Sequence, residues 1–276
     1  PTLPVRSKVS FMWDRIPLLM APSTETLFVE DLTNEPSDLT ISPLIRSQIQ
    51  ASASATPTLG TLPALFGDNA VGFDTRGRRH IAQGGFEYIA TPDLTVRAVY
   101  QRTDRQGVMP YGGAFGHSSL VELPAPIKHT LSDFDSTAEF LRDRLLVRAG
   151  YSGSWFNNAN TTVAFDNPFR SYDALASGSC TIAPGVTAPC SSAPGRGRLS
   201  LAPSSSSFTV NGLASVTLPR RTRLTWYVAL GSLKDAGDPL MAQTINAANT
   251  ALISPLERTH VEGEARTLTT NLTMVS

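Results

Sequence analysis

A two-residue period runs through most of the chain from residue 80 onward, and it limits the possible fold more than any other feature of the sequence. In 94–101, LTVRAVYQ, apolar residues occupy the even positions and polar residues occupy most of the odd positions. The same alternation recurs in 84–90, 134–141, 145–155, 208–218, 223–232 and 261–275. Alternation of this kind predicts β-strands with one apolar face and one polar face.

Short segments with turn chemistry join these strands in pairs, at 91–93 (TPD), 142–144 (RDR) and 219–222 (PRRT). Long loops are expected between the pairs, at 103–120, 168–206 and 235–258. The strands are expected to be about ten residues long, which is roughly what a tilted strand needs to cross a bilayer. Long strands with short turns on one rim and long loops on the other predict an all-β, antiparallel transmembrane β-barrel, here partial or truncated.

The alternative is a secreted β-sandwich or β-helix, in which the apolar face would meet a core. That fold explains the alternation equally well, but it explains the long strands and unequal loops less well. It also predicts a more charged solvent face, whereas only 17% of the residues are charged. The balance of 23 basic and 23 acidic residues argues against a nucleic-acid binder.

The first part of the chain, 1–79, is less regular than the alternating hairpins expected over 80–276. Within it, SKVSFMWDRI (7–16) is compatible with a strand, and 44–55 with a short helix or a polar segment inside a lumen. No secretory signal peptide is visible at residue 1, and we interpret the chain as a processed product or a fragment.

The stretch 151–169, YSGSWFNNANTTVAFDNPF, is predicted to form two strands joined by an Asn-rich turn. Its aromatic residues, Tyr151, Trp155 and either Phe165 or Phe169, are expected at a membrane interface. The Ser, Thr, Gly and Asn residues of the opposite face would then meet a polar lumen or whatever occupies it.

Two cysteines, Cys180 and Cys190, lie in a segment rich in Pro, Gly and Ser. Their closeness in a loop predicts a disulfide in an oxidising compartment, the alternative being two unpaired thiols.

Nothing in the sequence predicts catalysis, so we expect a protein that is not an enzyme and has no catalytic, cofactor-binding or metal-binding residues. No two of the four histidines have metal-ligand spacing, and there is no G-x-S-x-G turn. Asp133 and Asp135 are compatible with calcium ligands, but ordinary hydration or a rim ion pair explains them better.

Two sets of residues follow from the predicted faces. The charged residues expected to face the lumen, and to contact a partner there, are Glu87, Arg97, Glu139, Arg148 and Arg223. Cross-strand pairing could fix strand register, and the set could either hydrate a water-filled interior or contact a protein threaded through it. The residues expected to face lipid or form an aromatic girdle are Phe86, Tyr88, Tyr100, Tyr151, Trp155 and Trp226.

Several motifs in order resemble the MtrB/PioB family of outer-membrane β-barrels. They are FMWDRIP (11–17), the hairpin and VELPAPI segment within 88–140, GYSGSWFNN (150–158), FDNPF (165–169) and the LPRRTRL hairpin within 199–232. Each motif is a strand end or a turn, so their order and spacing carry the resemblance. The chain is shorter than members of that family, and the N-terminal CxxC of some of them is not found in it, being either absent or outside the chain.

The resemblance implies a protein of the bacterial outer membrane that sheathes a multihaem c-type cytochrome and serves extracellular electron transfer. The partners it implies are outer-membrane lipid, a periplasmic or lumen-inserted cytochrome that carries the haem c, and an extracellular multihaem cytochrome. The chain itself would bind no cofactor. The alternatives are a general diffusion porin with a water-filled lumen and a secreted β-rich adhesin.

Overall fold

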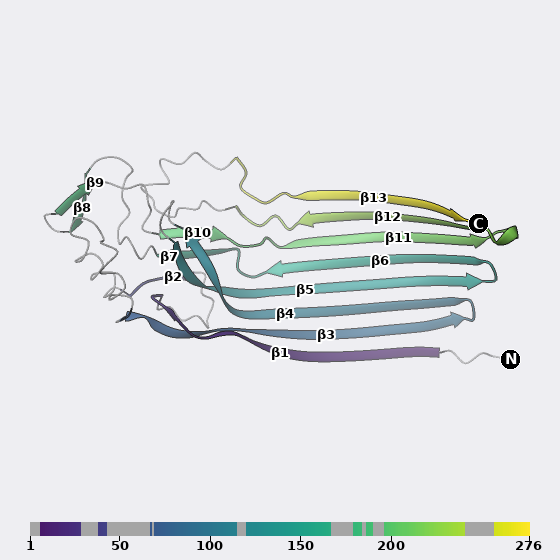
Figure 1. The fold of residues 1–276 in the computed structure, drawn as a ribbon, viewed down its shortest axis with the longest axis horizontal. Coiled ribbons are helices and arrows are strands. Elements are labelled where there is room, and N and C mark those ends of the chain that lie inside the picture. Colours follow the sequence, from purple (N-terminus) through teal and green to yellow (C-terminus); the bar gives the residue numbers. More distant parts are fainter. Residues whose placement is uncertain are drawn as a thin grey trace.

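The computed structural model describes residues 6–28, 38–42, 67, 69–114, 120–166, 179–183, 186–189, 196–240 and 257–276. Its main feature is one antiparallel sheet of eight strands in the order β1-β3-β4-β5-β6-β11-β12-β13 (Figure 1). The all-β, antiparallel architecture expected from the alternation is therefore confirmed. Among the described residues, no helix has the length and apolarity to span a membrane.

The strands of this sheet are long, and those near its first edge are the longest. Their bounds are β1 Arg6–Thr26, β3 Val71–Thr91, β4 Leu94–Ala114, β5 Leu120–Arg142, β6 Leu145–Asn158, β11 Ser205–Thr217, β12 Arg223–Asp235 and β13 Glu264–Val275. Strand β1 pairs with β3 over nearly its whole length, so the strand expected at 7–16 belongs to the same sheet.

Three tight turns join β3 to β4, β5 to β6 and β11 to β12, all at one end of the sheet (Figure 1). Two of them contain a residue with positive φ, Asp143 at 50° and Arg220 at 63°, the latter within the 3₁₀ turn Pro219–Arg221. The connections at the opposite end run through 27–70, 115–119, 159–204 and 236–263. We call these the turn end and the loop end of the sheet.

Over the residues that the structure describes, the large sheet does not close into a barrel. Strands β1 and β13 form its two edges, and no hydrogen-bonded ladder joins them among the described residues. All twelve residues of β13 are exposed.

Two expectations about local structure are wrong. The loop expected at 103–120 is mostly strand, because β4 and β5 pair without interruption from Leu94↔Phe140 to Ala114↔Leu120. Backbone pairing continues past the point where apolar alternation ends, since ladder hydrogen bonds do not depend on side-chain polarity. The strands are correspondingly longer than about ten residues, with β5 reaching 23.

The stretch 151–166 contains the two strands expected there, with the Asn-rich segment between them, but the two strands do not pair with each other. Its first half lies in β6, which pairs with β5 and β11, whereas β7 (Thr162–Asp166) leaves the large sheet. Strand β7 pairs instead with β10 (Arg196–Ser200) and β2 (Asp38–Leu39) in a small three-stranded sheet, which we call the cap sheet. The remaining pair, β8 (Ser179–Ala183) and β9 (Val186–Pro189), forms a separate ribbon.

The buried apolar cluster of the described residues lies where the cap sheet meets β5. It comprises Leu27, Phe28, Leu39, Ile41, Leu123, Val163 and Phe165. Phe165 is only 1% exposed, so the expectation that it serves as a membrane-interface aromatic is wrong. A polar contact between distant segments supports the same cluster, since the Ile41 N–H donates to Asp166 Oδ2 at 2.9 Å.

Gly107 lies in β4 directly opposite Gly77, at the point where the long strands run beyond the shorter ones. Its φ is +152°, and a Cβ there would lie 2.3 Å from the Arg76 carbonyl oxygen. Only glycine fits so close an approach of two backbones without displacement.

Candidate functional site: the two faces of the sheet

One face of the large sheet is apolar across all eight strands, and we call it the apolar face. Register partners form a continuous row through Val9, Phe86, Ala98, Ser136, Tyr151, Val210, Leu230 and Leu268. Many of these side chains are exposed, including Val9 at 77% and Leu268 at 70%. Exposed apolar surface on this scale indicates contact with something other than water.

The apolar face has a limited height along the strands. On β6 it runs from Leu145 at the turn end to Trp155, which is a rise of about 33 Å at roughly 3.3 Å per residue. With the tilt of a barrel strand this corresponds to about 25 Å, the height of the apolar band on an outer-membrane barrel. We call this part of the face the apolar band.

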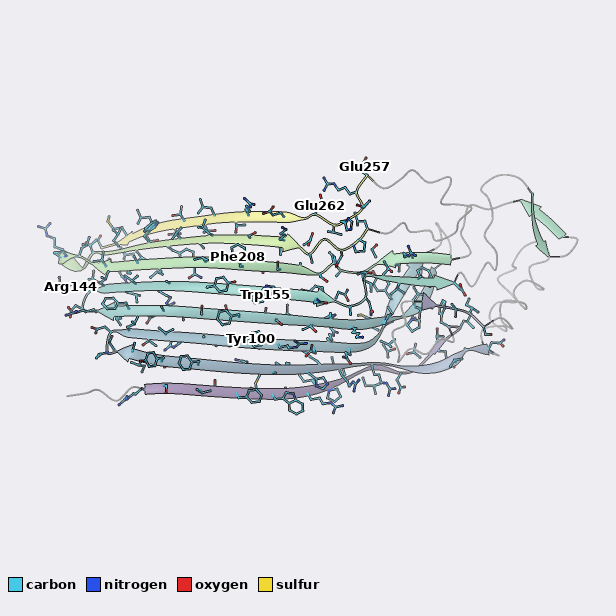
Figure 2. The ribbon with its side chains drawn as sticks, turned by 180° about the vertical axis from the view of Figure 1, so that it is seen from behind. Tyr100, Arg144, Trp155, Phe208, Glu257 and Glu262 are labelled. Atoms are coloured by element: carbon cyan, nitrogen blue, oxygen red, sulfur yellow. The ribbon has the colours of Figure 1, made fainter. Side chains whose placement is uncertain are left out.

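Aromatic residues border the apolar band on its loop-end side. They lie in two adjacent rows of the ladder and comprise Phe11, Trp13, Tyr100, Phe134, Trp155 and Phe208. Figure 2 shows Tyr100, Trp155 and Phe208 at similar positions along three different strands, with Arg144 at the turn end. Tyr and Trp favour such a boundary because one end of each side chain is apolar and the other polar.

The six residues predicted to face lipid or form a girdle all lie on this apolar face. Tyr100 and Trp155 belong to the aromatic border, while Trp226 lies two residues from the turn-end edge of the band. Phe86, Tyr88 and Tyr151 lie between these limits, and the rings of Phe86 and Tyr88 stack with centroids 6.3 Å apart. Their contact with lipid stays a prediction.

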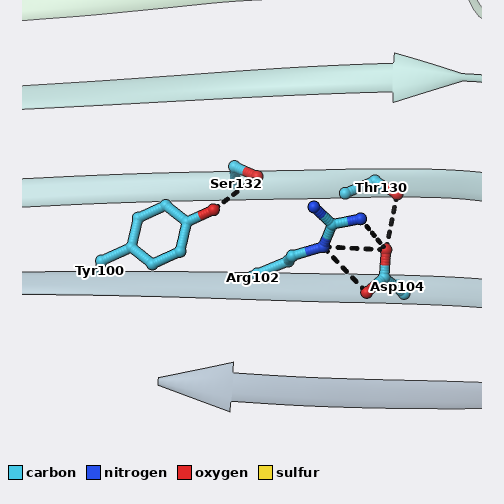
Figure 3. A network of polar contacts seen from close by, with 5 residues as sticks. All are labelled: Tyr100, Arg102, Asp104, Thr130 and Ser132. Atoms are coloured by element: carbon cyan, nitrogen blue, oxygen red, sulfur yellow. Dashed lines mark hydrogen bonds and ion pairs between the residues drawn. The ribbon is translucent and has the colours of Figure 1, made fainter. Parts of the chain in front are cut away.

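On β4, charged residues begin on the same face in the outer row of the aromatic border, which Arg102 shares with Trp13 and Trp155; Figure 3 shows Arg102 with Asp104. Arg102 donates to both carboxylate oxygens of Asp104, at 3.0 and 3.2 Å from Nε, and Thr130 donates to Asp104 at 2.7 Å. One step closer to the band, the Tyr100 hydroxyl donates to Ser132 at 3.2 Å. The change from apolar to charged side chains is therefore sharp.

The other face of the sheet is polar, and it carries the five charged residues predicted to face a lumen. Arg97 Nε lies 3.2 Å from Glu87 Oε2 on the neighbouring strand, and Arg148 Nε lies 2.9 Å from Glu139 Oε2. Each pair joins direct register partners. Arg223 donates instead to Ser215 at 2.9 Å. The lumen-facing role of the five residues stays a prediction.

A row of mostly small residues crosses the polar face one row from the Arg97–Glu87 pair, and we call it the small-residue shelf. It comprises Ser10, Gly85, Val99, Asp135, Ser152, Thr209, Gly231 and Thr267. A depression of about 320 Å³ opens over its centre, bordered by Asp133 and Asp135. Ser154 donates to Asp133 at 2.7 Å. Glycine, serine or threonine stands at six of the eight positions of the shelf, so the side chains there are short.

The cap sheet packs against the same polar face at the loop end. The contact residues on the large sheet are Gly113 and Leu123. They are odd-numbered, like Arg97 and Glu139, and the β4–β5 ladder has no register shift between them, so all four lie on the same face. A Cβ at Gly113 would lie 2.9 Å from both Leu123 and Phe165. The polar face is therefore covered at its loop end and open over the shelf.

Sequence reasoning missed two features of these faces. Phe11 and Trp13 were not assigned to the girdle, although their alternate spacing in a strand segment is a readable signal. The cap sheet gives no such signal, since its strands are short and far apart in sequence.

Some residues named in the sequence analysis lie outside the part of the chain that the structure describes. Residues 44–55, Phe169, Cys190 and the side chain of Cys180 lie outside the described part, so the helix and the disulfide stay predictions. Within the described ranges, no group of three or more His, Cys, Asp or Glu residues could hold a metal ion.

Comparison with known proteins gives one family. The model of the family described as outer membrane beta-barrel porin, MtrB/PioB, matches residues 7–276, which is nearly the whole chain. No curated protein matches the chain significantly.

Proposed function

Because the chain belongs to the MtrB/PioB family of outer-membrane β-barrel porins and therefore lies in the bacterial outer membrane, we propose that it sheathes a multihaem c-type cytochrome. The two proteins together would form a transmembrane electron conduit for extracellular electron transfer. The haem belongs to the cytochrome, and the chain supplies the insulating wall without catalysis of its own. An extracellular multihaem cytochrome would contact the loop end.

The observation that carries this proposal is the small-residue shelf on the polar face. A barrel wall that only holds water can carry side chains of any size, whereas a wall around a packed guest has to leave room for it. Gly85 and Gly231 lie on the shelf and carry no side chain that would stand between the sheet and a guest. The family resemblance supplies the identity of the guest.

The ion pairs near the shelf also support the proposal that a protein lies against the polar face. Arg97–Glu87 and Arg148–Glu139 are neutralised within the wall, so they present little net charge to an inserted protein. Internal pairing lets these four side chains face a guest without burying unpaired charge, whereas Asp133 and Asp135 give the depression an acidic side.

A general diffusion porin is the second candidate, and the family description of the chain as a porin favours it. In that case the same polar face would line a water-filled pore, and the depression over Asp133 and Asp135 would be hydrated. The secreted adhesin is not retained, since the family match assigns the chain to the outer membrane.

Affinity purification of the full-length protein from its native outer membrane separates the two candidates. A co-purifying protein with haem staining and a c-type Soret band is expected for the sheath. A colourless barrel that conducts ions in a planar bilayer would contradict the sheath and leave the porin.

A pair of variants sharpens the test. Ser152→Trp fills the shelf and is expected to lower the haem-to-barrel ratio, because Ser152 lies on the row over which the guest would pack. Tyr151→Trp is the matched control, since the adjacent side chain lies on the apolar face. Equal haem ratios in the two variants would argue against contact at the shelf.

A further inference from the structure

On the apolar face, the charges in and beyond the outer row of the aromatic border are unevenly distributed by sign. On β1, β3, β4 and β5, the first three rows past Tyr100 carry Arg15, Arg78, Arg102 and Lys128, and the acidic residue among them is Asp104. Asp104 is already bonded to Arg102 and Thr130 (Figure 3). The surface next to the apolar band is therefore cationic on this part of the sheet.

The least neutralised part of this surface lies on the β1–β3 pair. Arg15 is the register partner of His80, Arg78 that of Pro17 and Arg76 that of Leu19. All three arginines are exposed, and none has an acidic partner among the residues the structure describes. Successive members are two residues apart along the ladder, or roughly 7 Å. We call Arg15, Arg76 and Arg78 the arginine ladder.

The position of the arginine ladder relative to the aromatic border is fixed by contacts. The ring of Trp13, in the border, lies 6.3 Å from the ring of His80 on the same face. Arg15 follows Trp13 by two residues and therefore lies one row farther from the band. Aromatic residues take the headgroup boundary of a bilayer, so the next row outward lies at the depth of charged headgroups.

The loop end fixes which leaflet these headgroups belong to. In outer-membrane barrels the short turns face the periplasm and the long loops face the exterior. The arginine ladder lies on the loop-end side of the band, and therefore in the outer leaflet. The outer leaflet of this membrane is built of lipopolysaccharide, whose lipid A carries phosphate groups. Arginine suits phosphate because its planar guanidinium donates two parallel hydrogen bonds.

We propose that the arginine ladder binds the phosphates of lipid A in the outer leaflet. The site lies on the outside of the wall, so it is separate from the polar face that would meet a cytochrome. It rests on the proposed function only in taking the apolar face as the one that meets lipid. A lipid held there would anchor the β1 edge at a fixed depth in the membrane.

The test uses the intact protein, delipidated in detergent and titrated with lipid A under native mass spectrometry. Arg15→Gln combined with Arg78→Gln removes two members of the ladder. Each basic residue at an anionic membrane surface contributes roughly fivefold in affinity, so the double variant is expected to bind about twenty-five-fold more weakly. The matched control is Arg79→Gln with Arg105→Gln, which removes two arginines at the same height on the polar face and should leave the affinity unchanged.

The proposal is overturned if the two double variants bind lipid A with equal affinity, whether that affinity is unchanged or lowered relative to the unmodified protein. The unmodified protein gives a second readout that needs no folded variant, since it should prefer diphosphorylated lipid A to the dephosphorylated form. Equal affinity for the two forms would also overturn the proposal. If the purified protein carries no haem protein but still binds lipid A with this preference, the cytochrome sheath is contradicted and the lipid A site is supported.

Discussion

Replacing Val210 with arginine tests whether the apolar face of the sheet meets lipid. Val210 lies on β11 between Tyr151 and Leu230, close to the middle of the apolar band, and 49% of it is exposed. On a water-exposed sheet, such a substitution would change the free energy of unfolding by about 0.5 kcal/mol or less. At the midplane of a bilayer, an arginine on the lipid face costs about 2–4 kcal/mol.

The magnitude should depend on depth, which the register of the ladder sets. Leu224 lies at the turn-end edge of the band, three rows from Val210, so Leu224→Arg is expected to cost only about 0–1 kcal/mol. Thr209→Arg is the control for chain position, because Thr209 is adjacent to Val210 but lies on the polar face opposite Ser152 and Gly231. Its cost is expected to be small, since arginine there meets the acidic side of the depression.

The assay is equilibrium unfolding by denaturant of the protein folded into phosphatidylcholine vesicles. The expected order of destabilisation is Val210→Arg, then Leu224→Arg, then Thr209→Arg. At about 1.4 kcal/mol per tenfold, the first substitution lowers the folding equilibrium constant about 30- to 700-fold. If Val210→Arg costs no more than Thr209→Arg, the apolar face does not meet lipid and the reasoning fails.

Three further predictions follow from single contacts. Gly107→Ala is expected to destabilise the protein by about 1–3 kcal/mol, because the positive φ of Gly107 and its close approach to another backbone exclude a Cβ. Gly84→Ala is the control, since the space around Gly84 is open, and equal melting temperatures of the two variants would contradict the prediction. Phe165→Ala is expected to lower the free energy of unfolding by about 3–5 kcal/mol and to make the cap sheet, but not the large sheet, sensitive to limited proteolysis. Cleavage of both sheets at the same rate would contradict a separately stabilised cap sheet. A double-mutant cycle on Glu139 and Arg148 should give a coupling of about 0.2–1 kcal/mol that weakens in high salt, and a coupling insensitive to salt would contradict a solvated pair.

The faces and the turns of the large sheet could be predicted because they depend on neighbours in the sequence. A strand exposes alternate residues to opposite sides, so the parity of Phe86, Tyr151 and Trp226 is readable without any partner strand. Tight turns are equally local, as Asp143 and Arg220 show by their left-handed conformations. The resemblance to the family, confirmed by the match over residues 7–276, rested on the same strand ends and turns.

Strand length was harder to predict because the alternation reports the environment of the side chains and not the extent of the ladder. Past Arg102 the apolar positions give way to charged ones, and the sequence of β4 then resembles a loop. The backbone of β4 nevertheless stays paired with β5 up to Ala114. The change that suggested a loop is the boundary of the apolar band within a continuing strand.

By itself the sequence determined an antiparallel sheet with one apolar and one polar face, since the two-residue period of the side chains matches the pleat of a strand. Only the tertiary structure decided how the segments between the long strands are used. Phe165, which the sequence suggests for a membrane interface, lies in the core of the cap sheet, packed with Leu39 and Ile41 from more than a hundred residues earlier. Contacts over such separations depend on which strands the large sheet brings together, and no local pattern of residues encodes them.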